Sequence, residues 1–146
     1  MKVAVIDGQG GKMGQMLITR IKNEGICCEL LAIGTNSAAT AAMLKAGADA
    51  GATGENPIIV ASRNSDVIIG PIGIISADSL LGEITPAMAV AIGQSAATKL
   101  LLPVNLCNNI IVGTQSLSLS KVITETVDLL KQIDEKNSNS KYIPAP

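Results

Sequence analysis

Met1-Lys-Val-Ala-Val-Ile-Asp-Gly-Gln-Gly-Gly-Lys-Met-Gly14 is the stretch of sequence that decides the fold. Residues 3–6 form an apolar run of the kind found in buried strands, and this run leads straight into a glycine-rich turn. A helix is predicted to begin at about Lys12. This strand-turn-helix order is how α/β proteins present backbone N–H groups to a phosphate.

Strand-like and helix-like patterns alternate along the rest of the chain. Further strands are predicted at 28–33, 48–53, 67–70 and 100–105, and a sixth at 110–113 should pair antiparallel or turn away at the sheet edge. Helices are predicted at 12–23, 38–46, 57–64, 86–97 and 119–136. This alternation predicts an α/β fold, a Rossmann-like three-layer sandwich whose mostly parallel sheet has the strand order 3-2-1-4-5.

A chain of 146 residues is expected to form one domain. We place a single Rossmann-like nucleotide-binding domain at 1–136 and a tail at 137–146, which is polar, ends in Pro-Ala-Pro and is predicted to be disordered. The carboxyl ends of the strands should carry any ligand contacts, because open α/β sheets bind ligands there.

Composition excludes several classes of function. A net charge of −1 and an aromatic content of 1% argue against nucleic-acid binding, which needs a basic surface and often stacking platforms. The chain has no His and its three cysteines lack metal-ligand spacing, so no metal site is predicted. No signal peptide and no membrane span are recognised, and we expect a cytoplasmic protein with reduced thiols.

The glycine turn, residues 8–14, resembles the G-x-x-G-[RK]-M-G entry loop of dihydrodipicolinate reductases and prephenate dehydrogenases, which bind NAD(P). The resemblance covers about the first twenty residues and implies pyrophosphate contacts from the turn. The expected cofactor-binding residues there are Gly8, Gln9, Gly10, Gly11, Lys12, Met13 and Gly14.

The end of the second predicted strand departs from the NAD pattern. An NAD-specific fold usually places an acid there to bind the ribose hydroxyls, whereas this chain has Gly34, Thr35, Asn36 and Ser37. These residues, with Lys12, could accept a 2′-phosphate, so NADP or another nucleotide is as plausible as NAD. Gly70, Pro71, Ile72 and Gly73, which follow the fourth predicted strand, complete the expected cofactor site.

Polar residues at the same predicted edge are candidates for substrate binding: Thr53, Glu55, Asn56 and Asn105. The alternative is that Asn56 caps the helix at 57–64 and Glu55 complements its dipole. Glu83 is expected to be an ordinary charge before the helix that Thr85 caps. Asp7 could face the ligand or accept hydrogen bonds from the turn, and the sequence favours neither.

The whole chain also resembles a known family. The segments Val-Ile-Asp-Gly-Gln-Gly-Gly, Gly34-Thr-Asn-Ser, Met43-Leu-Lys-Ala-Gly-Ala, Gly51-Ala-Thr-Gly-Glu-Asn56, Gly70-Pro-Ile-Gly73 and Leu102-Pro-Val-Asn-Leu-Cys107 are similar to a family of short bacterial proteins. That family is frequent in clostridia-like anaerobes and is known only as a domain of unknown function. The resemblance implies a bacterial cytosolic protein and supplies no catalytic residues.

The sequence thus predicts a small nucleotide-binding protein whose first-choice cofactor is NAD(P), held by residues 8–14. Catalytic residues are not identified, and whether the protein is an enzyme is left open. The alternatives are a non-catalytic nucleotide or coenzyme A sensor, and an interaction subunit with no ligand. The expected partners are a small phosphate-bearing ligand and a second copy of the chain, which would dimerise through the helix at 86–97.

Overall fold

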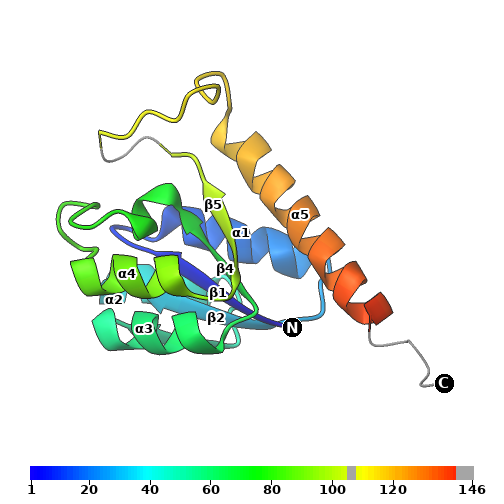
Figure 1. The fold of residues 1–146 in the computed structure, drawn as a ribbon. Helices are drawn as coiled ribbons and strands as arrows, with labels where there is room; N and C mark the ends of the chain where they lie inside the picture. Colours follow the sequence, from blue (N-terminus) through cyan, green and yellow to red (C-terminus); the bar gives the residue numbers. More distant parts are fainter. Residues whose placement is uncertain (105–107, 141–146) are drawn as a thin grey trace.

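The computed structural model describes residues 1–104 and 108–140. Strands and helices alternate as the sequence pattern predicts, and Figure 1 shows them as a sheet with helices on both faces. The elements are β1 Lys2–Asp7, α1 Lys12–Asn23, β2 Glu29–Gly34, α2 Ser37–Lys45, β3 Ala50–Thr53, α3 Glu55–Asn64, β4 Val67–Pro71, the 3-10 helix η1 Ile72–Ile75, α4 Pro86–Gln94, β5 Thr98–Leu102 and α5 Leu119–Ser140.

The sheet has five strands among the described residues, all parallel, in the order β3-β2-β1-β4-β5. The predicted strand order and fold class are confirmed. In the register, Asp7 of β1 pairs with Gly34 of β2, which pairs with Thr53 of β3. The carboxyl ends of these three strands therefore form one level edge, and the order reverses between β1 and β4 next to the glycine turn.

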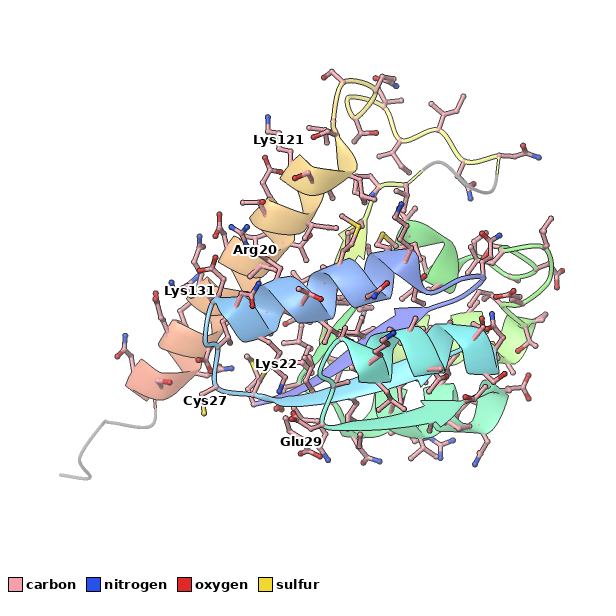
Figure 2. The ribbon with its side chains drawn as sticks, turned by 180° about the vertical axis from the view of Figure 1, so that it is seen from behind. Arg20, Lys22, Cys27, Glu29, Lys121 and Lys131 are labelled. Atoms are coloured by element: carbon pink, nitrogen blue, oxygen red, sulfur yellow. The ribbon has the colours of Figure 1, made fainter. Side chains whose placement is uncertain are left out.

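Two apolar layers hold the helices on the sheet. Alternate strand side chains such as Val3 and Val5 pack with α1, α2 and α5, while Ala4 and Ile6 pack with α3, α4 and η1. Viewed from behind, α1 lies between α2 and α5 (Figure 2). Because side chains alternate between the two faces of a strand, the continuous apolar run of β1 fills both layers.

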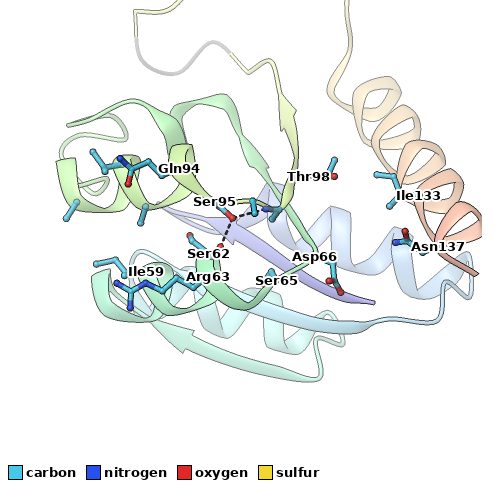
Figure 3. Close-up of a pocket in the computed structure, with 15 residues that line it drawn as sticks. Ile59, Ser62, Arg63, Ser65, Asp66, Gln94, Ser95, Thr98, Ile133 and Asn137 are labelled. Atoms are coloured by element: carbon cyan, nitrogen blue, oxygen red, sulfur yellow. Dashed lines mark hydrogen bonds between the residues drawn. The ribbon is translucent and has the colours of Figure 1, made fainter. Parts of the chain in front are cut away.

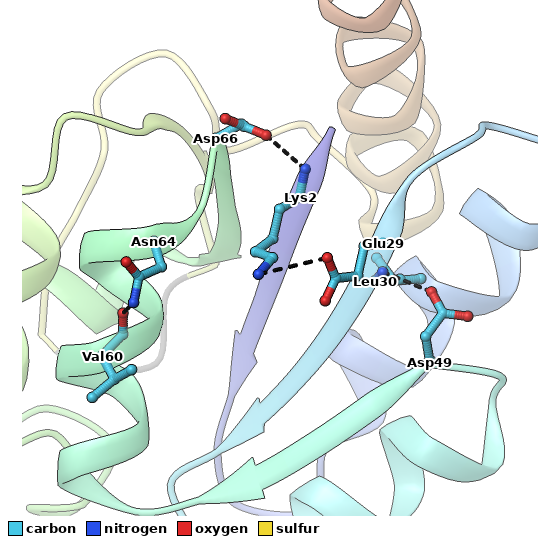
Figure 4. A network of polar contacts seen from close by, with 7 residues as sticks. All are labelled: Lys2, Glu29, Leu30, Asp49, Val60, Asn64 and Asp66. Carbon is cyan, nitrogen blue, oxygen red and sulfur yellow. Dashed lines mark hydrogen bonds and ion pairs between the residues drawn. The ribbon is translucent and has the colours of Figure 1, made fainter.

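Polar contacts tie together the amino ends of the strands (Figure 4). The Lys2 backbone N–H donates to Asp66 Oδ2 over 2.7 Å, and Lys2 Nζ lies 3.5 Å from Glu29 Oε2. The Leu30 N–H donates to Asp49 Oδ2 over 2.7 Å. These carboxylates satisfy backbone and lysine groups at the edge opposite the glycine turn, so they serve the fold.

Several local predictions differ from the structure. Residues 110–113 form no sixth strand: Val112 and Gly113 lie in a turn, and Gly113 has a φ of +90°. Strand β5 lies at 98–102 instead of 100–105, and α4 ends at Gln94 because Ser95 leaves the helical conformation. Helix α5 continues to Ser140, over the first four residues of the predicted tail, and 141–146 lie outside the described residues.

The helix predicted to form a dimer face uses its large apolar side chains within the protomer. Met88 and Ile92 of α4 are buried in the core, whereas Val90 is half exposed. A second copy of the chain as partner therefore stays a prediction without a defined surface.

Candidate functional site

The glycine turn has a backbone shape that depends on Gly11. Gly11 precedes α1 with φ +69°, in the left-handed region, and its N–H donates to the Gly8 carbonyl over 2.9 Å. A Cβ at Gly11 would lie 2.6 Å from the Ala39 Cα of α2. Only glycine satisfies both conditions, so α1 and α2 approach each other directly behind the turn.

Asp7 holds the turn from below. Its buried carboxylate accepts the Gly8 N–H at Oδ1 over 2.8 Å and the Gly14 N–H at Oδ2 over 2.7 Å. Of the two roles considered for Asp7, the structure shows the second, in which its carboxylate accepts hydrogen bonds from the turn. The carboxylate joins the end of β1 to the first turn of α1 and fixes the position of the intervening loop.

Other groups of the turn face outward. Within the described part of the chain, the amides of Gly10 and Lys12 donate to no protein acceptor. Gly10 is exposed, and a Cβ built on it would meet nothing within 4 Å. Two backbone donors and the exposed Lys12 side chain are thus available to an anion beside the N-terminus of α1.

Glu83 closes the turn from above, a role that its sequence position did not suggest. Its Oε2 accepts the Gln9 N–H over 2.7 Å and the Thr35 hydroxyl over 2.6 Å, and Asn36 Nδ2 lies 3.3 Å away. The expectation of an ordinary helix-terminus charge is therefore wrong. The residues between η1 and α4 fold back over the sheet edge, which brings the carboxylate to the turn and away from the amides of α4.

The two carboxylates have opposite pKa shifts. Burial raises the pKa of Asp7, the hydrogen bonds from Gly14 and Gly8 lower it, and the charge of Glu83 raises it; the net shift is upward. Partial burial raises the pKa of Glu83, but hydrogen bonds from Thr35, Gln9 and Asn36 outweigh this effect, and its pKa falls below the ordinary value. The hydrogen bonds from the turn and from the end of β2 therefore favour the ionised form of Glu83, whereas burial disfavours that of Asp7.

These shifts predict opposite pH effects for two variants. Because the pKa of Asp7 is raised in the folded state, this group favours folding at acidic pH and loses that contribution as pH rises above about 4. The difference in free energy of unfolding between wild type and Asp7→Asn should therefore shrink toward neutral pH. A lowered pKa means the reverse for Glu83: the advantage over Glu83→Gln should be full at neutral pH and fade below about pH 4.5. Thermal unfolding of wild type and the two variants between pH 3 and 7 measures both stability differences. If the two differences change with pH in the same direction, the opposite pKa shifts of Asp7 and Glu83 are contradicted.

The residues predicted after β2 lie beside the turn. Thr35 donates its N–H to the Asp7 carbonyl over 3.0 Å and its hydroxyl to Glu83. Asn36 caps α2 through Ala39 and donates from Nδ2 to the Gln9 carbonyl over 2.9 Å. Ser37 is exposed in the first turn of α2. Thr35 and Asn36 therefore already use their donors within the protein.

The candidate substrate residues are drawn into other contacts. Thr53 Oγ1 lies 2.6 Å from the hydroxyl of Thr40, and Glu55 accepts the Thr85 hydroxyl. Asn56 is exposed within the first turn of α3 and does not cap it: the cap position is Gly54, whose φ of +108° starts the helix earlier than predicted. Asn105 lies outside the described residues.

The segment after β4 lies partly at the turn. Pro71 lines a cavity of about 190 Å³ with residues 7–13, Leu80, Val104 and Leu119. Gly70 is buried where β4 meets β1, and a Cβ there would lie 2.5 Å from the Ile6 carbonyl oxygen. Ile72 and Gly73 belong to η1. Of the four predicted residues, only Pro71 faces the cavity.

A larger cavity lies at the opposite end of the sheet. It has a volume of about 850 Å³ and is bounded by α3, α4 and α5 near the amino ends of β4 and β5 (Figure 3). Arg63 and Asp66 line it, and Ser95 connects α4 to α3 through the Ser62 carbonyl. Its polar groups come from helix ends and connections, whereas the smaller cavity lies at the carboxyl edge with the glycine turn. We therefore take the smaller cavity as the candidate site.

Comparison with protein-family models matches residues 2–135 to the domain of unknown function DUF3842. The chain belongs to this family. The match spans the sheet, the glycine turn and most of α5, so the resemblance noted from the sequence is confirmed. No curated protein matches the chain.

Two solved structures are similar in outline to this member of the family. One is a dodecameric FMN-dependent Ubix-like decarboxylase from Escherichia coli O157:H7, with 14% identity and a TM-score of 0.41, covering 91% of this chain and 94% of that one. The other is a nucleoside-diphosphate-sugar epimerase from Pseudomonas aeruginosa, with 16% identity and a TM-score of 0.41, covering 94% of this chain and 49% of that one. This chain thus spans about half the length of the epimerase.

Two further findings concern the described residues alone. None of their helices is both long and apolar enough to cross a membrane. Within the same part of the chain, no group of three or more His, Cys, Asp or Glu side chains is placed to hold a metal ion.

Proposed function

We propose that this protein binds a dinucleotide cofactor of the NAD(P) class through the glycine turn. The observation that carries the proposal is the pair of outward amides, Gly10 and Lys12, at the N-terminus of α1 and at the point where the strand order reverses. A pyrophosphate is the group that such a turn suits, because it accepts several backbone N–H bonds and is stabilised by the helix dipole.

The space and the charge around the turn both suit a pyrophosphate. Open space surrounds Gly10, so backbone can approach a ligand there without a side chain in the way. Lys12 is exposed at the start of α1, lines the same cavity as Gly10 and supplies a positive charge there. Asp7 keeps the loop in place by binding two other amides, which leaves the outward ones fixed in position.

The proposal concerns binding and assigns no reaction. A nicotinamide cofactor, when bound, would supply hydride transfer. The chain has no His, and the carboxylates beside the turn are held by hydrogen bonds to backbone and hydroxyl groups. What its own residues do is bind and orient: the amides and Lys12 receive the phosphates, and Pro71 and Leu80 form an apolar wall of the cavity.

A ligand panel tests the proposal directly. We expect NAD or NADP at about 100 times its dissociation constant to stabilise the protein by about 2.7 kcal/mol, a rise in Tm on the order of 10 °C. ATP, FMN and coenzyme A serve as comparison ligands in the same thermal-shift assay. If neither dinucleotide changes the Tm at millimolar concentration, the protein is not an NAD(P)-binding protein.

A further inference from the structure

A carboxylate from a distant segment lies at the end of β2, where the sequence has no acid. Rossmann-type NAD sites place a carboxylate at this strand end, where it binds the ribose hydroxyls. Here β2 ends at Gly34, but the carboxylate of Glu83 lies against Thr35 and Asn36, the two residues that follow. It also lies against the first glycine of the turn, since a Cβ on Gly8 would be 2.5 Å from Glu83 Oε2.

The segment that carries Glu83 is anchored on both sides of it. Leu80 and Ile84 are buried in the core, and the Asp78 N–H donates to the Ile84 carbonyl over 2.8 Å. Asp78, Leu80 and Leu81 have positive φ angles, from +54° to +63°, a conformation that non-glycine residues rarely adopt. The core contacts maintain this strained backbone, so the place of the carboxylate is built into the fold.

The two oxygens of this carboxylate are used unequally. Oε2 accepts from Gln9, Thr35 and Asn36, whereas Oε1 has only the 3.4 Å contact with Asn36 Nδ2 among the described residues. An ionised carboxylate has about four lone-pair positions, so Oε1 retains capacity for donors. It could accept hydrogen bonds from hydroxyl groups, whereas a second anion would be repelled.

We propose that Glu83 is the ribose-binding residue of the site, and that the ligand is a dinucleotide with free 2′ and 3′ hydroxyls on its adenosine ribose. This inference rests on the proposed function. It selects NAD over NADP, which has a 2′-phosphate, and it disfavours coenzyme A, whose adenosine ribose is also phosphorylated. Glu83 is thus a specificity-determining residue.

The arrangement also argues against the NADP alternative suggested by the sequence. Thr35 and Asn36 could have received a 2′-phosphate, but Thr35 donates its hydroxyl to Glu83, and the Asn36 amide faces Glu83 and the Gln9 carbonyl. A phosphate placed there would displace these hydrogen bonds and meet a like charge at close range. The 2′ and 3′ hydroxyls of an unphosphorylated ribose would instead donate hydrogen bonds to the Glu83 carboxylate.

The test compares NAD with NADP by calorimetric titration of wild type, Glu83→Gln and Asp78→Asn. Wild type should bind NAD at least about tenfold more tightly than NADP, the effect of one charged hydrogen bond. In Glu83→Gln, NAD should weaken, NADP should strengthen, and the ratio should fall to within about threefold. Asp78→Asn makes the same charge change on the same segment, at an exposed residue whose side chain has no hydrogen bond or ion pair among the described residues, and should keep the wild-type ratio.

The outcomes separate this inference from the proposed function. Wild type that binds NADP as tightly as NAD overturns the inference and leaves the proposed function standing, and this comparison needs no variant. Equal weakening of both ligands in Glu83→Gln also overturns it, because that result assigns Glu83 only to holding the loop. Folded wild type that binds neither dinucleotide overturns the proposed function itself.

Discussion

Replacing Gly11 by alanine is expected to lower the free energy of unfolding by about 2–5 kcal/mol. The left-handed φ of +69° costs an alanine about 1–2 kcal/mol, and forcing its Cβ against the backbone of Ala39 adds about 1–3 kcal/mol. The added methyl group would push α2 away from α1 or distort the turn. Urea unfolding followed by far-UV circular dichroism measures the change.

Gly25→Ala is the matched control for this variant. Gly25 follows α1 with a similar φ of +65°, but a Cβ there would meet nothing within 4 Å. It should therefore cost only the conformational part, about 1–2 kcal/mol. Equal losses in the two variants would show that the close approach of α1 and α2 behind the turn contributes nothing to stability.

Gly10→Asp is expected to weaken dinucleotide binding by at least about 100-fold, or about 2.7 kcal/mol, without unfolding the protein. Gly10 is exposed and its backbone needs no positive φ, so the fold accepts a side chain there. The added carboxylate would lie beside the amides that receive the pyrophosphate and would repel it. Gly11→Asp could not make this test, because it would disturb the packing of α1 on α2.

The control for binding is Gly93→Asp on α4. Gly93 is also exposed and also has open space around its Cβ, but it lies near the end of α4, toward the amino edge of the sheet. Its variant should bind NAD as wild type does in isothermal titration. Loss of binding in both variants would indicate an effect of net charge, and wild-type affinity in Gly10→Asp would place the ligand elsewhere.

The parts of the fold that sequence analysis predicted well are those set by local patterns. The apolar run of β1, the glycine turn and the start of α1 follow within fourteen residues, so one window contains the evidence for all three. Thr85 occupies the N-cap position of α4, as predicted, because its side chain binds an amide three residues away. The strand order followed from the alternation of strands and helices.

The parts that could not be predicted depend on contacts across the chain. Glu83 accepts a hydrogen bond from the Gln9 amide, 74 residues away in the sequence. The segment before it has positive φ angles at Leu80 and Leu81, and leucine gives no sign of such a conformation in the sequence. In the sequence, Glu83 resembles any acid before a helix. The sequence shows that no acid follows β2, but it does not show which distant carboxylate lies at that edge.

The failed strand prediction at 110–113 has a comparable origin. Ile110, Ile111 and Val112 have strong strand propensity, yet Ile110 and Val112 are largely exposed and the segment contains no strand. Strand propensity is realised only where a neighbouring strand and a buried face are available. The sequence shows the propensity but not whether the edge of β5 offers a partner.

The most direct test of the central claim is to follow the backbone amide resonances of isotope-labelled protein during titration with NAD. The glycine-turn site predicts that the largest chemical-shift changes occur at Gly10 and Lys12, with smaller ones at Gln9 and Glu83. Ser62 and Ser95, which line the larger cavity at the other end of the sheet, should be unaffected. Changes concentrated at Ser62 and Ser95, with Gly10 and Lys12 unmoved, would contradict the assignment of the nucleotide site.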